Sequence, residues 1–156
     1  MITAHVESLT QRLDDLKPFF PAHWEELGIY RDRMPLAPQY GEYLRLDALG
    51  AALLVTLRKD GELVGYFVGF ITQGFHYGET LQCKMDICYI QPQHRGGGGR
   101  VLFDAVRGEL SRRGVKLWWV GSKDHHPIEG FYEAMGFTRQ ETHFTMWLGD
   151  DDARSA

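Results

Sequence analysis

The stretch that decides the fold is a run of glycines between two patterned segments: Gln93-His94-Arg95-Gly96-Gly97-Gly98-Gly99-Arg100. The segment before the run, Thr80 to about Ile90, alternates in the manner of a strand. The segment after it carries apolar residues at helical spacing and ends near Gly114. Flexible linkers seldom join two patterned segments directly, so the run is interpreted as a structured loop that opens a helix.

Consecutive glycines at the start of a helix suit the binding of a phosphate or diphosphate. They expose main-chain amides without β-carbons, and those amides lie at the positive end of the helix dipole. Arg95 and Arg100 add positive charge at the rim. A P-loop would need Gly-Lys-Ser/Thr where the chain reads Gly99-Arg100-Val101. A dinucleotide fingerprint would need an acidic residue where the next strand ends in Gly121-Ser122-Lys123.

The first fifty residues are predicted to be helices and loops. Val6 begins a series of apolar residues at helical spacing that Pro18 interrupts. The elements expected after that point are a helix over Pro21 to Leu27, an ordered loop over Arg31 to Pro38, and a helix over Gln39 to Leu49.

From Ala52 the hydrophobic period becomes that of strands. The strands expected are Leu53 to Leu57, Leu63 to Ile71 after a tight turn at Asp60-Gly61, Thr80 to Ile90, Val115 to Val120, and a final strand from about His143 to Leu148. A short helix is expected from near Pro127 to just before Gly136. This order predicts an α/β fold, with one mixed sheet flanked by helices on both faces.

The strand expected over Thr80 to Ile90 has two different faces. One set of alternate residues is uniformly apolar, and the other set is polar over its first half: Gln82, Lys84, Asp86, Cys88 and Ile90. The polar face is expected to line a cleft, with Asp86 on the same face as Cys88 and Ile90. Cys83 and Cys88 are then expected on opposite faces, where they cannot form a disulfide or a zinc site.

The bulk composition is that of one globular domain. The chain has 156 residues, 44% of them hydrophobic, and a formal net charge of -4. A net acidic chain lacks the positive field that nonspecific nucleic-acid binding needs. The sequence has no secretory leader or long apolar stretch, which predicts a cytoplasmic protein that does not enter a membrane. No histidine or carboxylate spacing indicates a metal site.

The glycine run resembles the diphosphate-binding signature of the GNAT superfamily of acetyl-CoA-dependent N-acetyltransferases, Gln/Arg-x-x-Gly-x-Gly/Ala. The phase of the following helix places the paired glycines at Gly97 and Gly99, with His94 at the Gln/Arg position. Anchoring on Arg95 instead places Gly98 first and leaves Arg100 where a small residue belongs. The resemblance implies acetyl-CoA as the acyl donor.

A second motif of the family appears downstream. Phe131-Tyr132-Glu133-Ala134-Met135-Gly136-Phe137 is similar to the latter half of its motif B, and His125 stands at the asparagine position. The similarity covers about Leu53 to Leu148. Before it, Trp24-Glu25-Glu26 and the stretch from Tyr30 to Leu36 look like the leader of a subgroup found in phage and prophage genomes.

The resemblance implies one mostly antiparallel GNAT-like domain. It would span residues 1–149, with a helical acceptor-side region at 1–50, a cofactor-binding core at 51–149, and a polar tail at 150–156. A main-chain amide at Ile90, or at its neighbours Tyr89 and Gln91, is expected to hold the thioester carbonyl. The remaining expected cofactor contacts come from the two motifs: His94, Arg95, Gly96, Gly97, Gly98, Gly99, Arg100, His125 and Phe131.

Two side chains are candidates for proton transfer. Tyr132 matches the family's acid, which protonates the coenzyme sulfur, and otherwise it is an ordinary aromatic residue of an amphipathic helix. Asp86 is the first choice of general base, with Glu79 in reserve, and its alternative role is a salt bridge with Lys84. The acceptor pocket is expected to be lined by aromatic residues and a histidine: Trp24, Tyr30, Phe75, His76 and Tyr77.

The implied activity is transfer of an acetyl group from acetyl-CoA to a primary amine by direct attack in a ternary complex. The acceptor is expected to be a small molecule or a peptide, and a homodimer is compatible with the resemblance. Two alternatives remain open from the sequence: a non-catalytic CoA-binding module or phage accessory protein of the same fold, and transfer of a longer acyl chain.

Overall fold

The computed structural model describes residues 1–150, and these form two compact units. Unit 1 comprises Met1–Pro18 and Gln39–Gly121, and unit 2 comprises Phe19–Pro38 with the chain from Ser122 onward. Apart from Asp150, the polar tail predicted at 150–156 lies outside the described residues. No helix of the described part is both long and apolar enough to cross a membrane.

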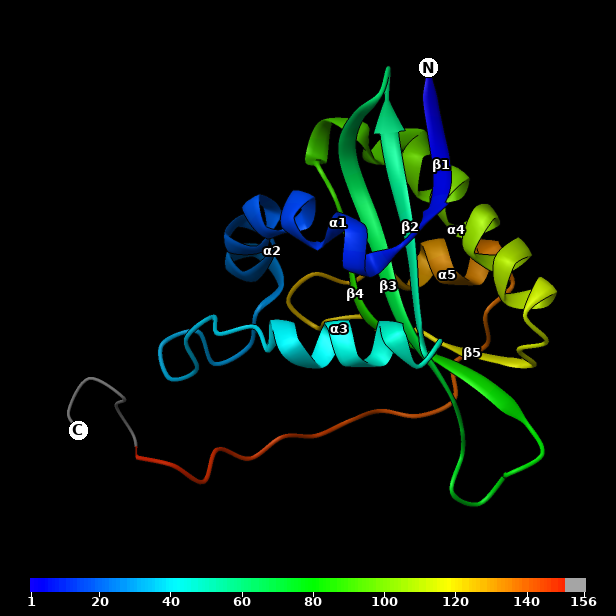
Figure 1. Ribbon diagram of the computed structural model, residues 1–156. Helices are drawn as coiled ribbons and strands as arrows, with labels where there is room; N and C mark the ends of the chain where they lie inside the picture. The colour runs from blue at the N-terminus through cyan, green and yellow to red at the C-terminus, as the bar shows by residue number, and fades with distance from the viewer. Residues whose placement is uncertain (151–156) are drawn as a thin grey trace. The chain divides into compact units, whose positions relative to one another are not determined.

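Unit 1 contains the whole sheet, and its elements follow the chain in the colours of Figure 1. Their bounds are β1 Ile2–Glu7, α1 Leu9–Leu16, α3 Tyr40–Ala48, β2 Ala52–Lys59, β3 Glu62–Gln73, β4 Leu81–Ile90, the short 3-10 helix η2 Pro92–His94, α4 Arg95–Arg112 and β5 Leu117–Trp119. A second 3-10 helix, η1 Lys17–Phe19, leads from α1 toward unit 2.

The five strands lie in the order β1-β2-β3-β4-β5. The first three neighbouring pairs are antiparallel, and β4 and β5 are parallel, which confirms the predicted mixed sheet. Asp60 and Gly61 join β2 to β3 with positive φ values of 50° and 89°, as a two-residue hairpin turn requires. Strand β3 is buried along most of its length, as expected for a central strand covered on both faces.

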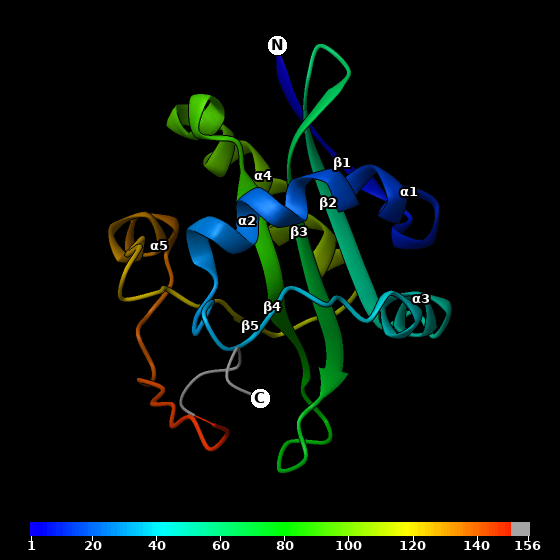
Figure 2. The same cartoon turned by 90° about the vertical axis from the view of Figure 1, so that its left-hand side faces the viewer.

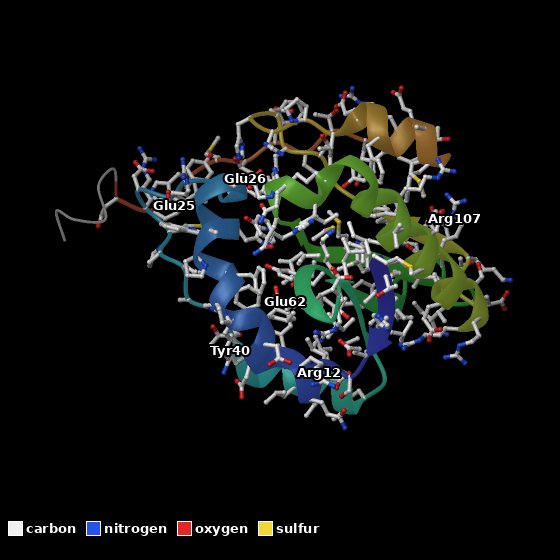
Figure 3. All side chains as sticks on the ribbon, turned by 90° about the horizontal axis from the view of Figure 1, so that it is seen from above. Arg12, Glu25, Glu26, Tyr40, Glu62 and Arg107 are labelled. Atoms are coloured by element: carbon white, nitrogen blue, oxygen red, sulfur yellow. The ribbon has the colours of Figure 1, made fainter. Side chains whose placement is uncertain are left out.

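Helices cover the two faces of this sheet differently. On one face the Phe103 ring of α4 lies 6.0 Å from the Phe67 ring of β3. On the other face the Tyr43 ring of α3 lies 5.8 Å from the Phe70 ring. Figure 3 labels Arg107 on α4 and Arg12 on α1, which lie on opposite sides of the sheet. We call these the α4 face and the α3 face.

A β-bulge at Asp86 changes which residues of β4 lie on each face of the sheet. Val68 pairs with Ile87 and Gly69 pairs with Met85, so Asp86 is the extra residue of β4 at this point. Side chains on either side of the bulge therefore fall out of simple alternation. Within each half of β4 the predicted alternation is correct, and across the bulge it is reversed.

The bulge overturns two expectations about faces. Cys88 pairs with Phe67 and therefore lies on the α4 face, whereas Asp86 contacts Tyr43 of α3. Asp86 thus does not share a face with Cys88 and Ile90. Cys83 pairs with Ile71, which shares the face of Phe67, so the two cysteines lie on the same face rather than on opposite faces. Both are free thiols, and burial raises the pKa of each to about 12.

Strand β1 was not expected. Ile2–Glu7 pairs with β2 from Ile2↔Lys59 to Glu7↔Leu54, and the helix begins at Leu9 rather than at Val6. The side chain of Ser8 caps that helix by accepting a hydrogen bond from the Gln11 amide. Val6 lies at helical spacing from the later leucines, yet it belongs to a strand. Its partner in β2 is distant in sequence, so the local pattern does not reveal the pairing.

Unit 2 contains the helices α2 Phe20–Leu27 and α5 Glu129–Met135. Gly136 ends α5 with a φ of 97°, as a left-handed helix cap requires. The predicted final strand is wrong, because residues 143–148 form no strand. Thr145 and Trp147 contact Tyr30, while Phe144, Met146 and Leu148 are exposed, and within residues 1–150 no strand pairs with them.

Candidate functional site

The glycine run forms the first turns of α4 rather than a loop before it. Helix α4 begins at Arg95, and its N-cap residue, His94, makes no side-chain capping hydrogen bond. The amides of the first turn of a helix have no partner within the helix. This end of α4 therefore presents uncapped donors at the positive end of an 18-residue helix.

The glycines of the run have different surroundings. Gly96 and Gly97 are exposed, and a β-carbon built on either would meet nothing within 4 Å. Gly98 is buried, and its β-carbon would come within 2.8 Å of Leu57 Cδ2. The first two leave space for a ligand over the amides, whereas the third lets the helix approach the sheet.

The edge of β4 that faces away from β3 is paired with β5 over only part of its length. Within the described chain, β5 pairs with β4 only at Gln82, Cys83 and Lys84. The Gln91 amide donates to the Val64 carbonyl at 2.9 Å, so the polar groups of Gln91 face β3. Because these groups alternate along a strand, the amide and carbonyl of Ile90 face the opposite edge.

Arg95 joins that edge to the helix. Its Nε donates to the Ile90 carbonyl at 2.7 Å, and its guanidinium lies 5.6 Å from the centre of the Tyr89 ring. The guanidinium is thus bonded to the strand through its Nε, and the charge that Arg95 adds at the rim stays a prediction. Arg100 is exposed and lies 3.8 Å from Asp104.

Asp86 accepts a hydrogen bond from the hydroxyl of Tyr43. The residue remains accessible to solvent, yet burial by its neighbours raises the pKa of its carboxyl above the ordinary value, against the lowering effect of the Tyr43 hydrogen bond. Lys84 does not pair with it: the Lys84 Nζ lies 5.9 Å from the centre of the Trp119 ring. Sequence reasoning missed Tyr43, because nothing in the pattern of α3 indicates a contact 43 residues away.

Unit 2 holds the residues of the second motif. Tyr132 is buried in α5, its ring centre lies 5.4 Å from that of Phe137, and its carbonyl accepts the Phe137 amide at 3.0 Å. Phe131 precedes it, with a ring separation of 6.0 Å. His125 is exposed in the turn between Lys123 and His126. The hydrogen bond at the end of α5 therefore holds the backbone of Tyr132 in place.

The expected acceptor residues fall in both units. In unit 2, the Tyr30 hydroxyl is 2.7 Å from Thr145 Oγ1, and Trp24 packs against Gly28 near the end of α2. In unit 1, Phe75, His76 and Tyr77 are exposed in the connection between β3 and β4, which projects beyond the sheet in Figure 2. The His76 and Tyr77 rings lie edge to face with centres 6.4 Å apart.

These features suit a ligand that carries both a diphosphate and a thioester. The open first turn of α4 offers amide donors for phosphate oxygens, and the Ile90 amide, five residues before Arg95, offers a donor for a carbonyl oxygen. No group of three His, Cys, Asp or Glu side chains in residues 1–150 is arranged to hold a metal ion.

The comparison with protein families identifies one family for this chain. The model of the acetyltransferase (GNAT) family matches residues 10–137. Ribosomal-protein-alanine N-acetyltransferase from Brucella melitensis biovar Abortus 2308 has a similar fold, with a TM-score of 0.72, 18% identity, and coverage of 96% of this chain and 99% of that one. No curated protein matches the chain.

Two further solved structures have the same fold. A predicted acetyltransferase from Clostridium acetobutylicum, solved with acetyl-CoA, has a TM-score of 0.71 and 13% identity over 95% of this chain and 97% of that one. Glucosamine-6-phosphate N-acetyltransferase from Arabidopsis thaliana has a TM-score of 0.70 and 10% identity over 96% and 99%. At such identities the likeness shows the fold alone.

Proposed function

The chain belongs to the acetyltransferase (GNAT) family, and on that premise we propose that it transfers the acetyl group of acetyl-CoA to a primary amine by direct attack in a ternary complex. The observation that carries the proposal is the join between β4 and α4. There the outward-facing Ile90 amide lies just before an uncapped helix start whose glycines Gly96 and Gly97 are open.

The proposed binding roles follow from these groups. The amides of the first turn of α4 hold the diphosphate, with Gly97 leaving room for it. The Ile90 amide donates a hydrogen bond to the thioester oxygen, on which negative charge develops during attack. Arg95 holds the Ile90 carbonyl and so fixes the peptide group that follows the Ile90 amide. Bound acetyl-CoA supplies an acetyl group activated as a thioester.

Two side chains move protons in this proposal. The Asp86 carboxylate accepts a proton from the amine nitrogen, directly or through water, as the new carbon–nitrogen bond forms. Tyr132 donates its hydroxyl proton to the sulfur that leaves when the carbon–sulfur bond breaks. Its motif and its fixed place in α5 support this role. The aromatic residues around Trp24, Tyr30 and Phe75 are proposed to line the acceptor site.

An acetylation screen tests the proposal. The protein is incubated with acetyl-CoA and single members of several amine classes: aminoglycosides, amino sugars, polyamines, peptide N-termini and lysine peptides. Free CoA is then measured by a thiol reagent. Acceptor-dependent thiol release, together with an acetylated amine seen by mass spectrometry, is the expected result. Tight binding of acetyl-CoA in calorimetry without release for any class would instead identify a non-catalytic CoA-binding module.

A further inference from the structure

Tyr43 and Asp86 connect a helix to the bulge of β4. The Tyr43 hydroxyl donates a hydrogen bond to the Asp86 carboxylate, across 43 residues of sequence. We propose that Tyr43 is a positioning residue, which orients the Asp86 carboxylate so that it can take the proton of the attacking amine. This inference rests on the proposed function, because it extends the role given there to Asp86.

The position of Asp86 explains why such a partner is needed. As the extra residue of a bulge, Asp86 has no opposite residue on β3 to pack against. Its side chain is accessible to solvent, where a carboxylate can occupy several rotamers. Among residues 1–150 the Tyr43 hydroxyl is the hydrogen-bond donor to this carboxylate. That one bond therefore selects its orientation.

Tyr43 is itself held in place. Its ring packs 5.8 Å from that of Phe70, centre to centre, on the α3 face. One turn further along α3, the Asp47 carboxylate accepts hydrogen bonds from the amide of Thr10 at 2.9 Å and from its hydroxyl at 2.5 Å. Helix α3 is thus tied to α1 at one end and to the sheet in its middle. A phenol carried on such a helix is a fixed donor.

Among the ionisable groups that surround Tyr43 and Asp86, the Asp86 carboxyl is the one that titrates in the acid range. Burial and the neighbouring Asp86 raise the pKa of Tyr43, and burial raises that of Tyr66 on β3, so both phenols stay protonated at working pH. Tyr40 on α3 lies against Lys17, and Lys84 of β4 adds a positive charge on the same face. A hydrogen bond from Tyr43 favours the ionised carboxylate.

The test compares Tyr43→Phe with the matched control Tyr40→Phe, which removes a hydroxyl one turn away on the same helix. The pKa of Asp86 is measured by carbon NMR of labelled aspartate carboxyls, with Asp86→Asn for assignment. The pH profile of kcat/KM is measured for the same variants. We expect Tyr43→Phe to raise the Asp86 pKa and the acid limb of the profile together by about one pH unit. Tyr40→Phe should change neither.

Three results would decide against the inference in distinguishable ways. An unchanged Asp86 pKa in a folded Tyr43→Phe protein would show that the hydrogen bond does not act on the carboxylate. A shifted pKa with an unshifted acid limb would show that Tyr43 does not act through a catalytic Asp86. Absence of acetyl transfer by the wild-type protein would remove the proposed function itself, whatever NMR shows. In the Asp86→Asn background, Tyr43→Phe should have no further effect on kcat.

Discussion

Gly98 of α4 and Leu57 of β2 are in such close contact that a β-carbon on the glycine would lie 2.8 Å from Leu57 Cδ2. This contact sets how deeply the start of the helix sits on the sheet. Gly96 and Gly97, in the same turn, meet nothing within 4 Å of the corresponding position. One run of identical residues therefore serves packing at one position and leaves open space at two others.

The first prediction separates these two uses. Gly98→Val overpacks the contact with Leu57 and should lower the free energy of unfolding by about 1–3 kcal/mol in urea denaturation. Gly97→Val places its side chain in open space, so stability should hold within about 0.5 kcal/mol. Acetyl-CoA binding to Gly97→Val should be lost in calorimetry, because the side chain covers the amides. Wild-type affinity in this variant would disprove the proposed diphosphate site.

The second prediction concerns Asp86→Asn, which keeps the shape of the side chain and removes its charge. The variant should lose about 10²- to 10⁴-fold in kcat, measured by thiol release, because no carboxylate accepts the amine proton. The raised pKa means that the folded protein binds this proton more tightly than the unfolded chain, so ionised Asp86 costs stability at neutral pH. Asp86→Asn should therefore melt at or above the wild-type temperature. Full activity would exclude Asp86 as the base.

The third prediction concerns Tyr132→Phe. If the hydroxyl protonates the leaving sulfur, kcat should fall by about 10²-fold while the affinity for acetyl-CoA stays within about twofold. The ring and its contact with Phe137 remain, so the melting temperature should change little. An unaltered kcat would leave Tyr132 as a packing residue of α5, and weaker acetyl-CoA binding alone would assign it to the cofactor.

The fourth prediction concerns stability against pH. Hydrogen bonds from Arg112, and then from Arg113, lower the pKa of Glu109 to about 2. This stabilisation is fully present above about pH 5 and is lost as the pH falls from 4.5 toward 2. Glu109→Gln should cost about 1–2 kcal/mol at pH 7 in urea denaturation, and less at pH 3.5. The control Asp104→Asn breaks an exposed pair and should cost at most about 0.5 kcal/mol.

Most strands could be predicted because their signals are local. Alternating apolar residues and the Asp60-Gly61 turn are properties of a few neighbouring residues, and β2 and β3 appear where they indicate. Strand β1 and the stretch 143–148 show the limit of such signals. Ile2–Glu7 is a strand because Ala52–Lys59 lies beside it, whereas residues 143–148 alternate without a paired strand among the described residues. An alternating pattern predicts a strand, but the segment forms one only when it is hydrogen-bonded to a neighbouring strand.

The candidate site was predictable in part for the same reason. The glycine run and the strand before it are adjacent in sequence, and the structure contains both, with the glycines at the start of α4. The bulge at Asp86 is different, because it arises from how β3 and β4 pair, and a one-residue irregularity reverses every face beyond it. The hydrogen bond of the Arg95 guanidinium and the hydrogen-bond partner of Asp86 likewise depend on tertiary contacts, which a local pattern does not reveal.

The bulge also has a consequence for how the protein can change. Because Asp86 is surplus to the pairing of β3 with β4, replacing it alters no rung of the ladder. The chemistry at this point can therefore be varied, by selection or by engineering, while the scaffold that carries it stays the same. If Asp86 is the proposed base, the side chain that accepts the proton and the residues that pair β3 with β4 are different residues, so either can change without the other.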